Sequence, residues 1–254
     1  MAELLLLYHK NKLRKVAHNM DVLYTIKDGR EFNEELIYSL RSLINIPHDR
    51  VFIVGGFPSD IKKSEIIHIP TEQKSTKWRN STSNLKTAIL DDRLSDDFIY
   101  MNDDFFILKP ISEPVKELNL HFGTMAAYYD RLAKKHAETP YMRGMLETSN
   151  LLINLGIKEP LSYELHIPFV FNKKHLKQMF SIKGIDNINV LHKRSLYGNL
   201  YLKNSKFHSD VKIHTDKEFD TNKCDKFLST NDLSFIKIRP FLEAQFNKKS
   251  KYEI

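Results

Sequence analysis

The 254-residue chain has a single cysteine, Cys224, and lacks the glycine-rich and metal-binding motifs of several large enzyme classes. One cysteine excludes an intramolecular disulfide and favours a reducing, cytoplasmic setting. No Gly-x-Gly-x-x-Gly and no Gly-Lys-Ser/Thr loop occurs, so a dinucleotide oxidoreductase and a P-loop nucleotidase lose their main support. Zinc-type Cys/His spacing and a Gly-x-Ser-x-Gly elbow are also missing. What remains is a set of acidic and basic side chains, which suits phosphate chemistry.

Long hydrophobic runs are missing as well. The first apolar stretch, Leu4 to Leu7, is four leucines long and follows Glu3. A signal peptide needs a longer apolar region after basic residues, and a membrane-spanning helix needs about 20 apolar residues. We therefore expect neither. The 16 Phe and 11 Tyr indicate a chain that folds around a core.

Basic residues outnumber acidic ones and give a formal net charge of +7. Lysine clusters at 10–15, 173–174 and 248–251 supply much of this charge. Such a field attracts anions, so sugar nucleotides, nucleic acid and an anionic membrane face are all possible partners. A solvated basic surface is the plain alternative, because the charge is spread out and forms no arginine-rich arm.

Strand and helix patterns alternate through the first half of the chain. Strands are expected at 21–26, 51–54, 65–69 and 98–101, and helices at 32–46 and 80–90. This order predicts an α/β fold with a mostly parallel sheet covered by helices. We expect a single catalytic domain over residues 1–254, with a nucleotide-binding half at about 1–120 and an acceptor-binding half at about 121–254.

The second half is less regular. Residues 123–129 are compatible with a strand, 138–155 and 175–180 with helices, and 195–202 with either. The last forty residues are rich in lysine and interrupted by Pro240. No repeat or low-complexity linker marks a domain boundary.

The most informative stretch is the strand at 98–101, which runs directly into Asn102, Asp103 and Asp104. Two carboxylates at the end of a buried strand need a partner, and Mg²⁺ or Mn²⁺ fits, because these ions take oxygen ligands and leave positions for phosphate. A polar turn between two strands is the plain alternative. Ligands of parallel α/β sheets bind beyond the carboxyl ends of the strands, and Asp28 with Gly29 follows the first strand in the same way.

Seven blocks of the sequence, taken in order, resemble the conserved regions of the Stealth proteins. These are bacterial capsule-type sugar-phosphate transferases, related to the animal enzyme that tags lysosomal glycans. The blocks lie at 21–29, 35–42, 80–81, 94–104, 166–168, 227–232 and 241–253. Residues 94–104 match the family pattern L-S-x-x-F-I-Y-x-N-D-D, and 35–42 resemble E-L-R-Y-S-L-R-S.

The remaining blocks resemble their family patterns more loosely. Residues 21–29 resemble the end of I-D-V-V-Y-T-W-V-D-G, and 80–81 the end of F-N-S. His166-Ile167-Pro168 is similar to H-x-P, and the last two blocks are similar to a region that ends F-P-x-x-S-x-F-E. The chain departs from these patterns at Ile26, Arg79, Leu85 and Asn247, where the family has Trp, Phe, Glu and Pro. These departures leave the reaction subtype and the acceptor open.

The resemblance implies a glycosyltransferase-A-like nucleotide-sugar fold with a mixed, mostly parallel sheet. It also implies a nucleotide-sugar donor and transfer of a sugar 1-phosphate to a hydroxyl of a glycan. In that reaction the hydroxyl attacks the β-phosphorus and a nucleoside monophosphate leaves. Such a reaction needs charge neutralisation and in-line positioning.

Individual residues can be matched to these needs. A Mg²⁺ or Mn²⁺ ion on Asp103 and Asp104 would bridge the diphosphate oxygens. His166 is the expected general base, since its ordinary pKa lies near working pH. Asp28 or Asp232 would add a metal ligand or position the acceptor. Arg41 and Arg194 are expected to clamp phosphate.

Each assignment has a structural alternative. Arg41 lies on a helix and would serve equally well in an ion pair, His166 could be a structural histidine, and Asp28 could be a turn residue. The full set of residues expected to bind substrate is Tyr24, Thr25, Asp28, Gly29, Arg41, Asn80, Ser81, Asn102, Arg194 and Asn231.

Three other functions stay open from the sequence. The sugar itself could move, by attack on the anomeric carbon, with a nucleoside diphosphate as leaving group. The acceptor could be nucleic acid, such as hydroxylated bases of viral DNA, which an enzyme reaches by flipping the base out. The chain could also be a non-catalytic nucleic-acid- or glycan-binding relative, although the paired carboxylates argue against this. The oligomeric state is not readable from the sequence.

Overall fold

The computed structural model describes residues 20–29, 31–214, 219–221 and 224–254. The leucine stretch at 4–7 and the lysine cluster at 10–15 lie outside the described residues.

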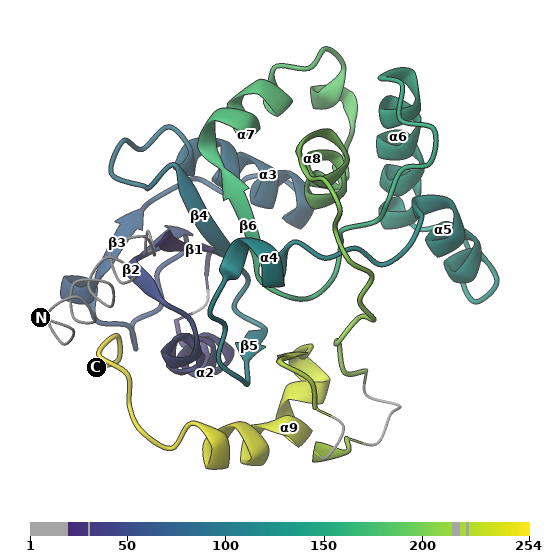
Figure 1. Cartoon of the computed structure of the whole chain (residues 1–254). Helices are drawn as coiled ribbons and strands as arrows, with labels where there is room; N and C mark the ends of the chain where they lie inside the picture. Colours follow the sequence, from purple (N-terminus) through teal and green to yellow (C-terminus); the bar gives the residue numbers. More distant parts are fainter. Residues whose placement is uncertain (1–19, 30, 215–218, 222–223) are drawn as a thin grey trace, which may run out of the picture.

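A five-stranded mixed sheet lies at the centre, in the order β3-β2-β1-β4-β6 (Figure 1). Its parallel strands are β1 (Met20–Ile26), β2 (His48–Gly55), β3 (Ile66–Ile69) and β4 (Asp97–Met101). The edge strand β6 (Phe169–Asn172) pairs antiparallel with β4. The α/β fold with a mixed, mostly parallel sheet is therefore confirmed.

Both faces of the sheet are buried, because alternate residues of its strands enter two different hydrophobic clusters. In β1, Val22, Tyr24 and Ile26 belong to one cluster and Leu23 belongs to the other. Helix α2 (Glu34–Ser42) packs Leu36 and Leu40 into the first cluster. The second cluster takes residues from α3 (Lys77–Ala88), α6 (Pro140–Asn154), α7 (Lys173–Phe180) and α8 (Lys193–Tyr201). Figure 1 shows α2 on one side of the sheet and α3, α7 and α8 on the other.

A third hydrophobic cluster contains no residue of the central sheet. The short strands β5 (Phe105–Ile107) and β7 (Phe227–Ser229) pair antiparallel in a separate sheet. Helix α9 (Asp232–Gln245) covers this sheet with Phe235, Ile238 and Leu242. The remaining helices are α4 (Pro114–Leu118), α5 (Met125–Ala133) and the 3₁₀ turns η1 (Leu43–Asn45), η2 (Lys63–Glu65) and η3 (Ile185–Asn187).

Two expectations for the second half need correction, and one strand there was not expected. Residues 123–129 do not form a strand, because Thr124 accepts a hydrogen bond from the Ala127 amide (3.2 Å) and so caps α5. The edge strand β6 has no counterpart among the expected elements, since four residues carry little periodicity. Pro240 does not interrupt the chain but lies inside α9, where packing in the third cluster outweighs the roughly 3 kcal/mol cost of an interior proline.

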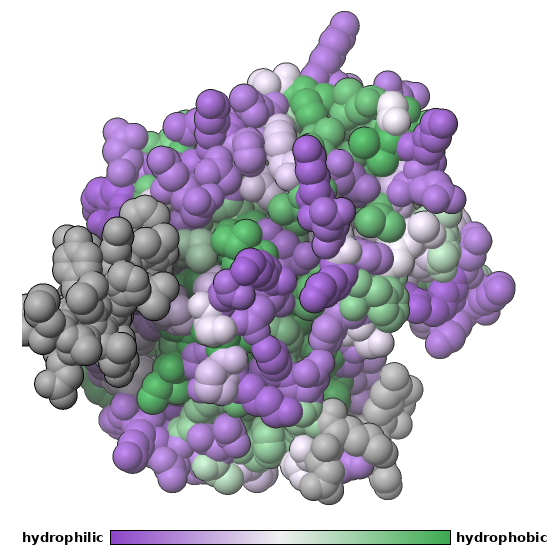
Figure 2. Space-filling view, viewed as in Figure 1, coloured by the Kyte–Doolittle hydropathy of each residue, from purple (hydrophilic) through white to green (hydrophobic). Residues whose placement is uncertain are grey.

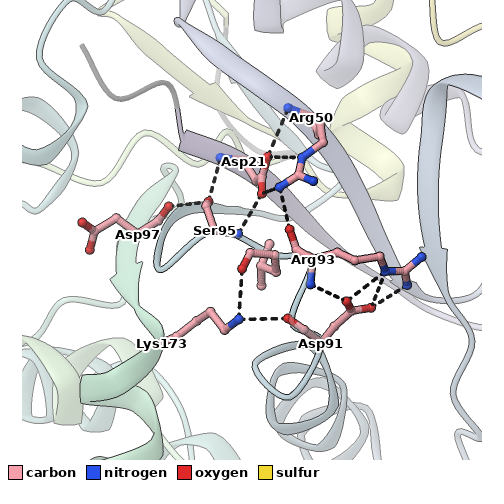
Figure 3. A network of polar contacts seen from close by, with 8 residues as sticks. Asp21, Arg50, Asp91, Arg93, Ser95, Asp97 and Lys173 are labelled. Atoms are coloured by element: carbon pink, nitrogen blue, oxygen red, sulfur yellow. Dashed lines mark hydrogen bonds and ion pairs between the residues drawn. The ribbon is translucent and has the colours of Figure 1, made fainter. Parts of the chain in front are cut away.

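A closed polar network fixes the amino-terminal edge of the sheet (Figure 3). The Asp21 carboxylate is 1% exposed and accepts from the Arg50 guanidinium (2.8 and 3.0 Å), the Arg50 amide (3.2 Å) and the Ser95 amide (2.8 Å). The Ser95 hydroxyl in turn faces the Asp21 amide (3.1 Å) and donates to the Asp97 carbonyl (2.6 Å). Four hydrogen bonds use all the acceptor positions of one carboxylate. The Asp21 side chain therefore links β1, β2 and the start of β4 and has no acceptor position left for a ligand.

Hydrophilic residues cover most of the face seen in Figure 2. None of the helices in the described part of the chain is long and apolar enough to cross a lipid bilayer.

Candidate active site

A cleft of about 600 Å³ opens where β1 and β4 end and α3 and α9 begin. It lies beyond the carboxyl ends of the parallel strands, as expected for an α/β sheet. Nine of the residues predicted from the sequence line it: Thr25, Asp28, Asn80, Ser81, Asn102, Asp103, Asp104, Asn231 and Asp232. Segments spread over two hundred positions of the sequence thus converge on one cavity.

Asp103 and Asp104 are each positioned by a different part of the chain. The Asn33 side-chain amide donates to Asp103 Oδ2 (2.7 Å), while its oxygen accepts from the Leu36 amide and caps α2. Asp104 Oδ2 accepts from Lys212 Nζ (3.1 Å) and from the Ser229 hydroxyl (3.3 Å). The Asp104 side chain is 17% exposed and that of Lys212 is 18% exposed. Lys212 lines the cleft and brings a positive charge to its acidic wall.

A further carboxylate lies on the same wall. Glu35 is 6% exposed, lines the cleft and accepts from the Thr230 hydroxyl (2.9 Å). Asn231 caps α9 by accepting from the Leu233 and Ser234 amides (3.1 and 2.8 Å). The cap places Asp232 in the first turn of α9, where the helix dipole stabilises a negative charge.

The hydroxyl and amide side chains of Thr25, Asn80 and Ser81 form another part of the cleft lining. The Tyr100 hydroxyl lies 3.1 Å from Thr25 Oγ1 and 3.3 Å from Ser81 Oγ, and Lys193 Nζ donates to Ser81 Oγ (3.0 Å). Burial would raise the pKa of Tyr100, but Lys193 and Arg194 reverse the effect and leave the pKa below its ordinary value.

Gln73 fixes the loop that follows β1. Its side chain donates to the Ile26 carbonyl (2.7 Å) and accepts from the Asp28 amide (3.1 Å). Asp28 is thereby held at the rim of the cleft, next to the strand end from which it was predicted.

A smaller cavity of about 180 Å³ adjoins the cleft and shares Ser81 and Asn102 with it. His166 lines this cavity, and its Nδ1 lies 2.8 Å from Asp210 Oδ2. The His166 amide also donates to Asp210 Oδ1 (3.0 Å). Burial would raise the pKa of Asp210, but the hydrogen bonds and charge of His166 hold that pKa at about 2. An ionised Asp210 fixes a proton on Nδ1 and makes Nε2 the basic nitrogen of the ring.

Two buried charges complete the smaller cavity. Glu164 Oε1 accepts from the Ser195 amide (3.1 Å) and hydroxyl (3.3 Å) at the start of α8. Burial would raise the pKa of Glu164, but His192, Arg194 and Lys193 lower it below its ordinary value. The Arg194 side chain donates to the Leu165 carbonyl and lies 5.1 Å from the Phe105 ring centroid.

Three of the predicted residues line neither cavity. Tyr24 is buried, its hydroxyl lies 3.0 Å from Ser39 Oγ, and burial raises its pKa. Gly29 is exposed in a turn, with φ of +81°. Arg41 forms a two-point ion pair with Glu253 (2.9 and 2.6 Å) and donates to the Phe246 carbonyl (3.0 Å). Its donors thus bind the C-terminal segment to α2, which is the structural alternative foreseen for it.

Sequence reasoning missed several residues at the site. Glu35, Gln73, Glu164, Lys193, Asp210 and Lys212 all lie in or against the two cavities. Glu35 begins one of the blocks quoted above, so a signal for it existed. Asp210 and Lys212 lie in an irregular segment without any local pattern, and only the tertiary structure reveals them.

The side-chain oxygens at the end of β4 are of the kind that bind a hard divalent cation. Within the described ranges, no three His, Cys, Asp or Glu side chains lie close enough to enclose a metal ion by themselves. Asp103, Asp104 and Asn102 nevertheless offer adjacent oxygen donors on one cleft. Mg²⁺ is commonly held by one or two carboxylates together with substrate phosphates, so the residues present fit Mg²⁺ or Mn²⁺ bound jointly with a diphosphate.

Comparisons with known proteins find solved structures with a similar fold but no family or curated protein with a similar sequence. No family model matches the chain, and no curated protein is significantly similar to it in sequence. An active-site mutant of LgtC has a similar structure, with a TM-score of 0.51 and 10% identity over 91% of this chain and 98% of that chain. Galactosyltransferase LgtC in complex with donor and acceptor sugar analogues is similar as well, with a TM-score of 0.51 and 11% identity over the same shares.

The fold is that of GT-A glycosyltransferases. At these identities the likeness establishes the fold alone. The Stealth family is not shown by any comparison.

Several of the Stealth-like blocks contact one another within this GT-A fold. Tyr24 of the first block meets Ser39 of the second, and Asp104 of the fourth meets Ser229 of the sixth. Arg41 of the second block pairs with Glu253 of the last. The resemblance therefore covers residues that assemble the site as well as residues that line it.

Proposed function

We propose that this protein is a metal-dependent transferase that takes a sugar 1-phosphate, or the sugar itself, from a nucleotide-diphosphate sugar to a hydroxyl of a glycan. The observation that carries the proposal is the placement of Asp103 and Asp104 side by side on a cleft beyond β4 in a GT-A fold. A volume of about 600 Å³ is within the range of small-molecule sites. The sugar-phosphate version rests on the resemblance to Stealth proteins.

The acidic wall is assigned to the diphosphate. When bound at Asp103 and Asp104, Mg²⁺ or Mn²⁺ neutralises charge on the phosphate oxygens. Lys212, which pairs with Asp104 (3.1 Å), is close enough to exchange this carboxylate for a phosphate oxygen when donor binds. The hydroxyl and amide wall formed by Thr25, Ser81 and Asn80 then faces the uncharged parts of the donor.

The smaller cavity is assigned to the acceptor hydroxyl. His166 Nε2 removes the hydroxyl proton, and Asp210 stabilises the imidazolium that forms. Because Ser81 and Asn102 belong to both cavities, the reacting atoms meet where the cavities join. Geometry therefore supports His166 as base and Asp210 as the residue that positions it.

Two bond changes fit this arrangement. In sugar-phosphate transfer, the acceptor oxygen bonds the β-phosphorus, the bond from that phosphorus to the bridging oxygen breaks, and a nucleoside monophosphate leaves. In glycosyl transfer, the acceptor oxygen bonds the anomeric carbon, the bond from that carbon to the phosphate oxygen breaks, and a nucleoside diphosphate leaves. In both cases the proton goes to His166.

The test is a product assay with Mn²⁺ and a panel of nucleotide sugars. Nucleoside monophosphate as product supports sugar-phosphate transfer, and nucleoside diphosphate supports glycosyl transfer. Release of neither product, from any donor and with a range of glycan acceptors, would contradict the transferase proposal. Unchanged biological activity in the double variant Asp103→Asn/Asp104→Asn, together with absence of turnover, would favour a binding relative instead.

A nucleic-acid acceptor gains no support from the site. Glu164 and Asp210, which flank the place assigned to the acceptor, both have lowered pKa values and stay ionised. Glu164 and Asp210 offset the positive charges of Lys193 and Arg194 at the same cavity, so no excess of positive charge faces a phosphate backbone there.

A further inference from the structure

We propose that Phe122 and Phe207, together with Arg131, form a second acceptor subsite that stacks on a sugar ring of a glycan. We name these three residues the aromatic platform. The proposal rests on the proposed function, because it places the body of the acceptor whose hydroxyl reaches His166. It adds a binding surface outside both cavities and sets a minimum length for the acceptor.

One ring of the platform is exposed, and its neighbours hold it in place. Phe207 is 63% exposed, and its ring is nearly parallel to that of Phe122 (16°, centroids 6.3 Å apart). The Arg131 guanidinium lies 4.2 Å from the Phe122 centroid, and His121 meets Phe207 edge-on at 6.1 Å. An exposed aromatic ring held by neighbours on its other sides is a preorganised contact surface, because little side-chain freedom remains to be lost on binding.

The chain itself connects the platform to the proposed base. His121 and His208 are joined by a backbone hydrogen bond (2.9 Å), and His121 also bonds the Lys206 carbonyl (3.0 Å), so Phe207 is fixed beside Phe122. Three residues after Phe207, Asp210 holds His166 (2.8 Å). An extended chain advances about 3.3 Å per residue, so the Cα atoms of Phe207 and Asp210 lie no more than about 10 Å apart. We assign one ring of an oligosaccharide to the platform and the reacting hydroxyl of another ring to His166.

A second route links the platform to the smaller cavity. Tyr128 meets Phe122 edge-on (5.3 Å) and lies 4.9 Å from the Arg131 guanidinium. Tyr128 is also hydrogen-bonded to Tyr141, which lines the smaller cavity. Aromatic side chains thus run without interruption from the place assigned to the reacting hydroxyl out to Phe207.

The chemistry of the platform favours a glycan over other ligands. One face of a pyranose ring carries mainly C–H groups, which gain from burial against an aromatic face. The N–H groups of Arg131 are suited to donate to sugar hydroxyls. A nucleic acid would also stack, but its phosphates would meet the ionised Asp210 at the inner end of the same path.

Binding of the full-length protein to a printed glycan array tests the platform directly. The array carries mono- to tetrasaccharides, and a labelled oligothymidylate is measured in parallel. We expect wild type to bind at least one class of oligosaccharide and no monosaccharide, Phe207→Ala to weaken that binding about tenfold, and Phe207→Tyr to retain it. Ile236→Ala, which removes another exposed apolar side chain (70% exposed), is the matched control and should bind like wild type.

Four results would overturn the platform: no glycan bound by wild type, glycan binding that is equal in Phe207→Ala, binding of monosaccharides as tight as that of oligosaccharides, or Phe207-dependent binding of the oligothymidylate alone. Donor turnover by wild type is followed separately. Absence of turnover together with Phe207-dependent glycan binding would contradict the transferase and support the platform. Turnover together with Phe207-independent glycan binding would contradict the platform alone.

Discussion

The two ends of the central sheet use the same residue types in opposite ways. At the amino end, the Asp21 carboxylate is 1% exposed, and all four of its acceptor positions accept hydrogen bonds from Arg50 and Ser95 (Figure 3). At the carboxyl end, Asp104 has one lysine and one hydroxyl as partners and lies on a cleft of about 600 Å³. The first arrangement is complete within the protein, whereas the second leaves acceptor capacity that faces a cavity. In the proposed function, this difference separates a structural carboxylate from one that binds a ligand.

Membership of a motif does not make this distinction, but position along the strand does. Asp21 lies near the start of β1 and Asp28 follows the end of this strand, and both belong to the same Stealth-like block, yet only Asp28 lines the cleft. Substitutions at the two ends should therefore have opposite effects on activity and on stability.

The double variant Asp103→Asn/Asp104→Asn should lose transferase activity by at least about 10³-fold, because electrostatic stabilisation of the transferring group depends on these charges. Asn keeps the size of each side chain, so the melting temperature should change by no more than about 3 °C. Initial rates with a nucleotide sugar and Mn²⁺, together with thermal melts, provide the measurement. A large loss of stability with normal activity in the folded fraction would contradict this assignment, because the two carboxylates would then be structural.

Asp21→Ala should show the opposite pattern. Removing this carboxylate leaves the Arg50 and Ser95 amides without acceptors, which should lower the free energy of unfolding by about 2–4 kcal/mol. Donor affinity of the folded protein should stay at the wild-type value. Urea titration and calorimetric titration measure the two quantities, and a selective loss of donor affinity would show that the amino end is not purely structural.

Asp210→Asn tests a residue that resembles both ends, since Asp210 is paired like Asp21 and contacts His166 at the smaller cavity. The variant should lower kcat by about 10²-fold, because a neutral partner no longer stabilises the His166 imidazolium. The acidic limb of the pH–rate profile should move, while KM for the donor stays unchanged. An unaltered pH profile would leave Asp210 with a structural role only.

Asp210 should also make stability depend on pH. Its pKa falls from 3.8 to about 2 on folding, so the stabilising effect is complete above about pH 4 and is lost as the pH falls through 2. The loss amounts to about 2 kcal/mol of unfolding free energy, and Asp210→Asn should not show it. Denaturant titrations of both proteins between pH 5 and pH 2 would reveal the difference, and parallel curves would count against it.

The sequence was most informative where a strand ends. Strands near 21–26, 51–54, 65–69 and 98–101 were predicted because buried parallel strands form short apolar runs, and the residues just beyond them form one rim. Nine predicted residues line the cleft for this reason. Chain topology alone was enough to bring Asp28 and Asp103 together.

The rest depends on contacts that no local pattern encodes. Arg41 has a helical position suited to phosphate binding, but its partner Glu253 lies 212 residues away in the sequence. Asp210 and Lys212 come from an irregular segment that passes His166 and Asp104 in turn. In the segment at 123–129, a single cap at Thr124 decides between helix and strand.

The most direct test of the carboxyl-end cleft is calorimetric titration of wild type, Asp21→Ala and Asp103→Asn/Asp104→Asn with a panel of nucleotide-diphosphate sugars, each with Mn²⁺ and with chelator. We predict Mn²⁺-dependent binding of at least one donor to wild type and to Asp21→Ala, and loss of that binding in the double variant. Binding of no donor to wild type, or equal binding to the double variant, would contradict the assignment of the cleft to a metal-bound nucleotide sugar.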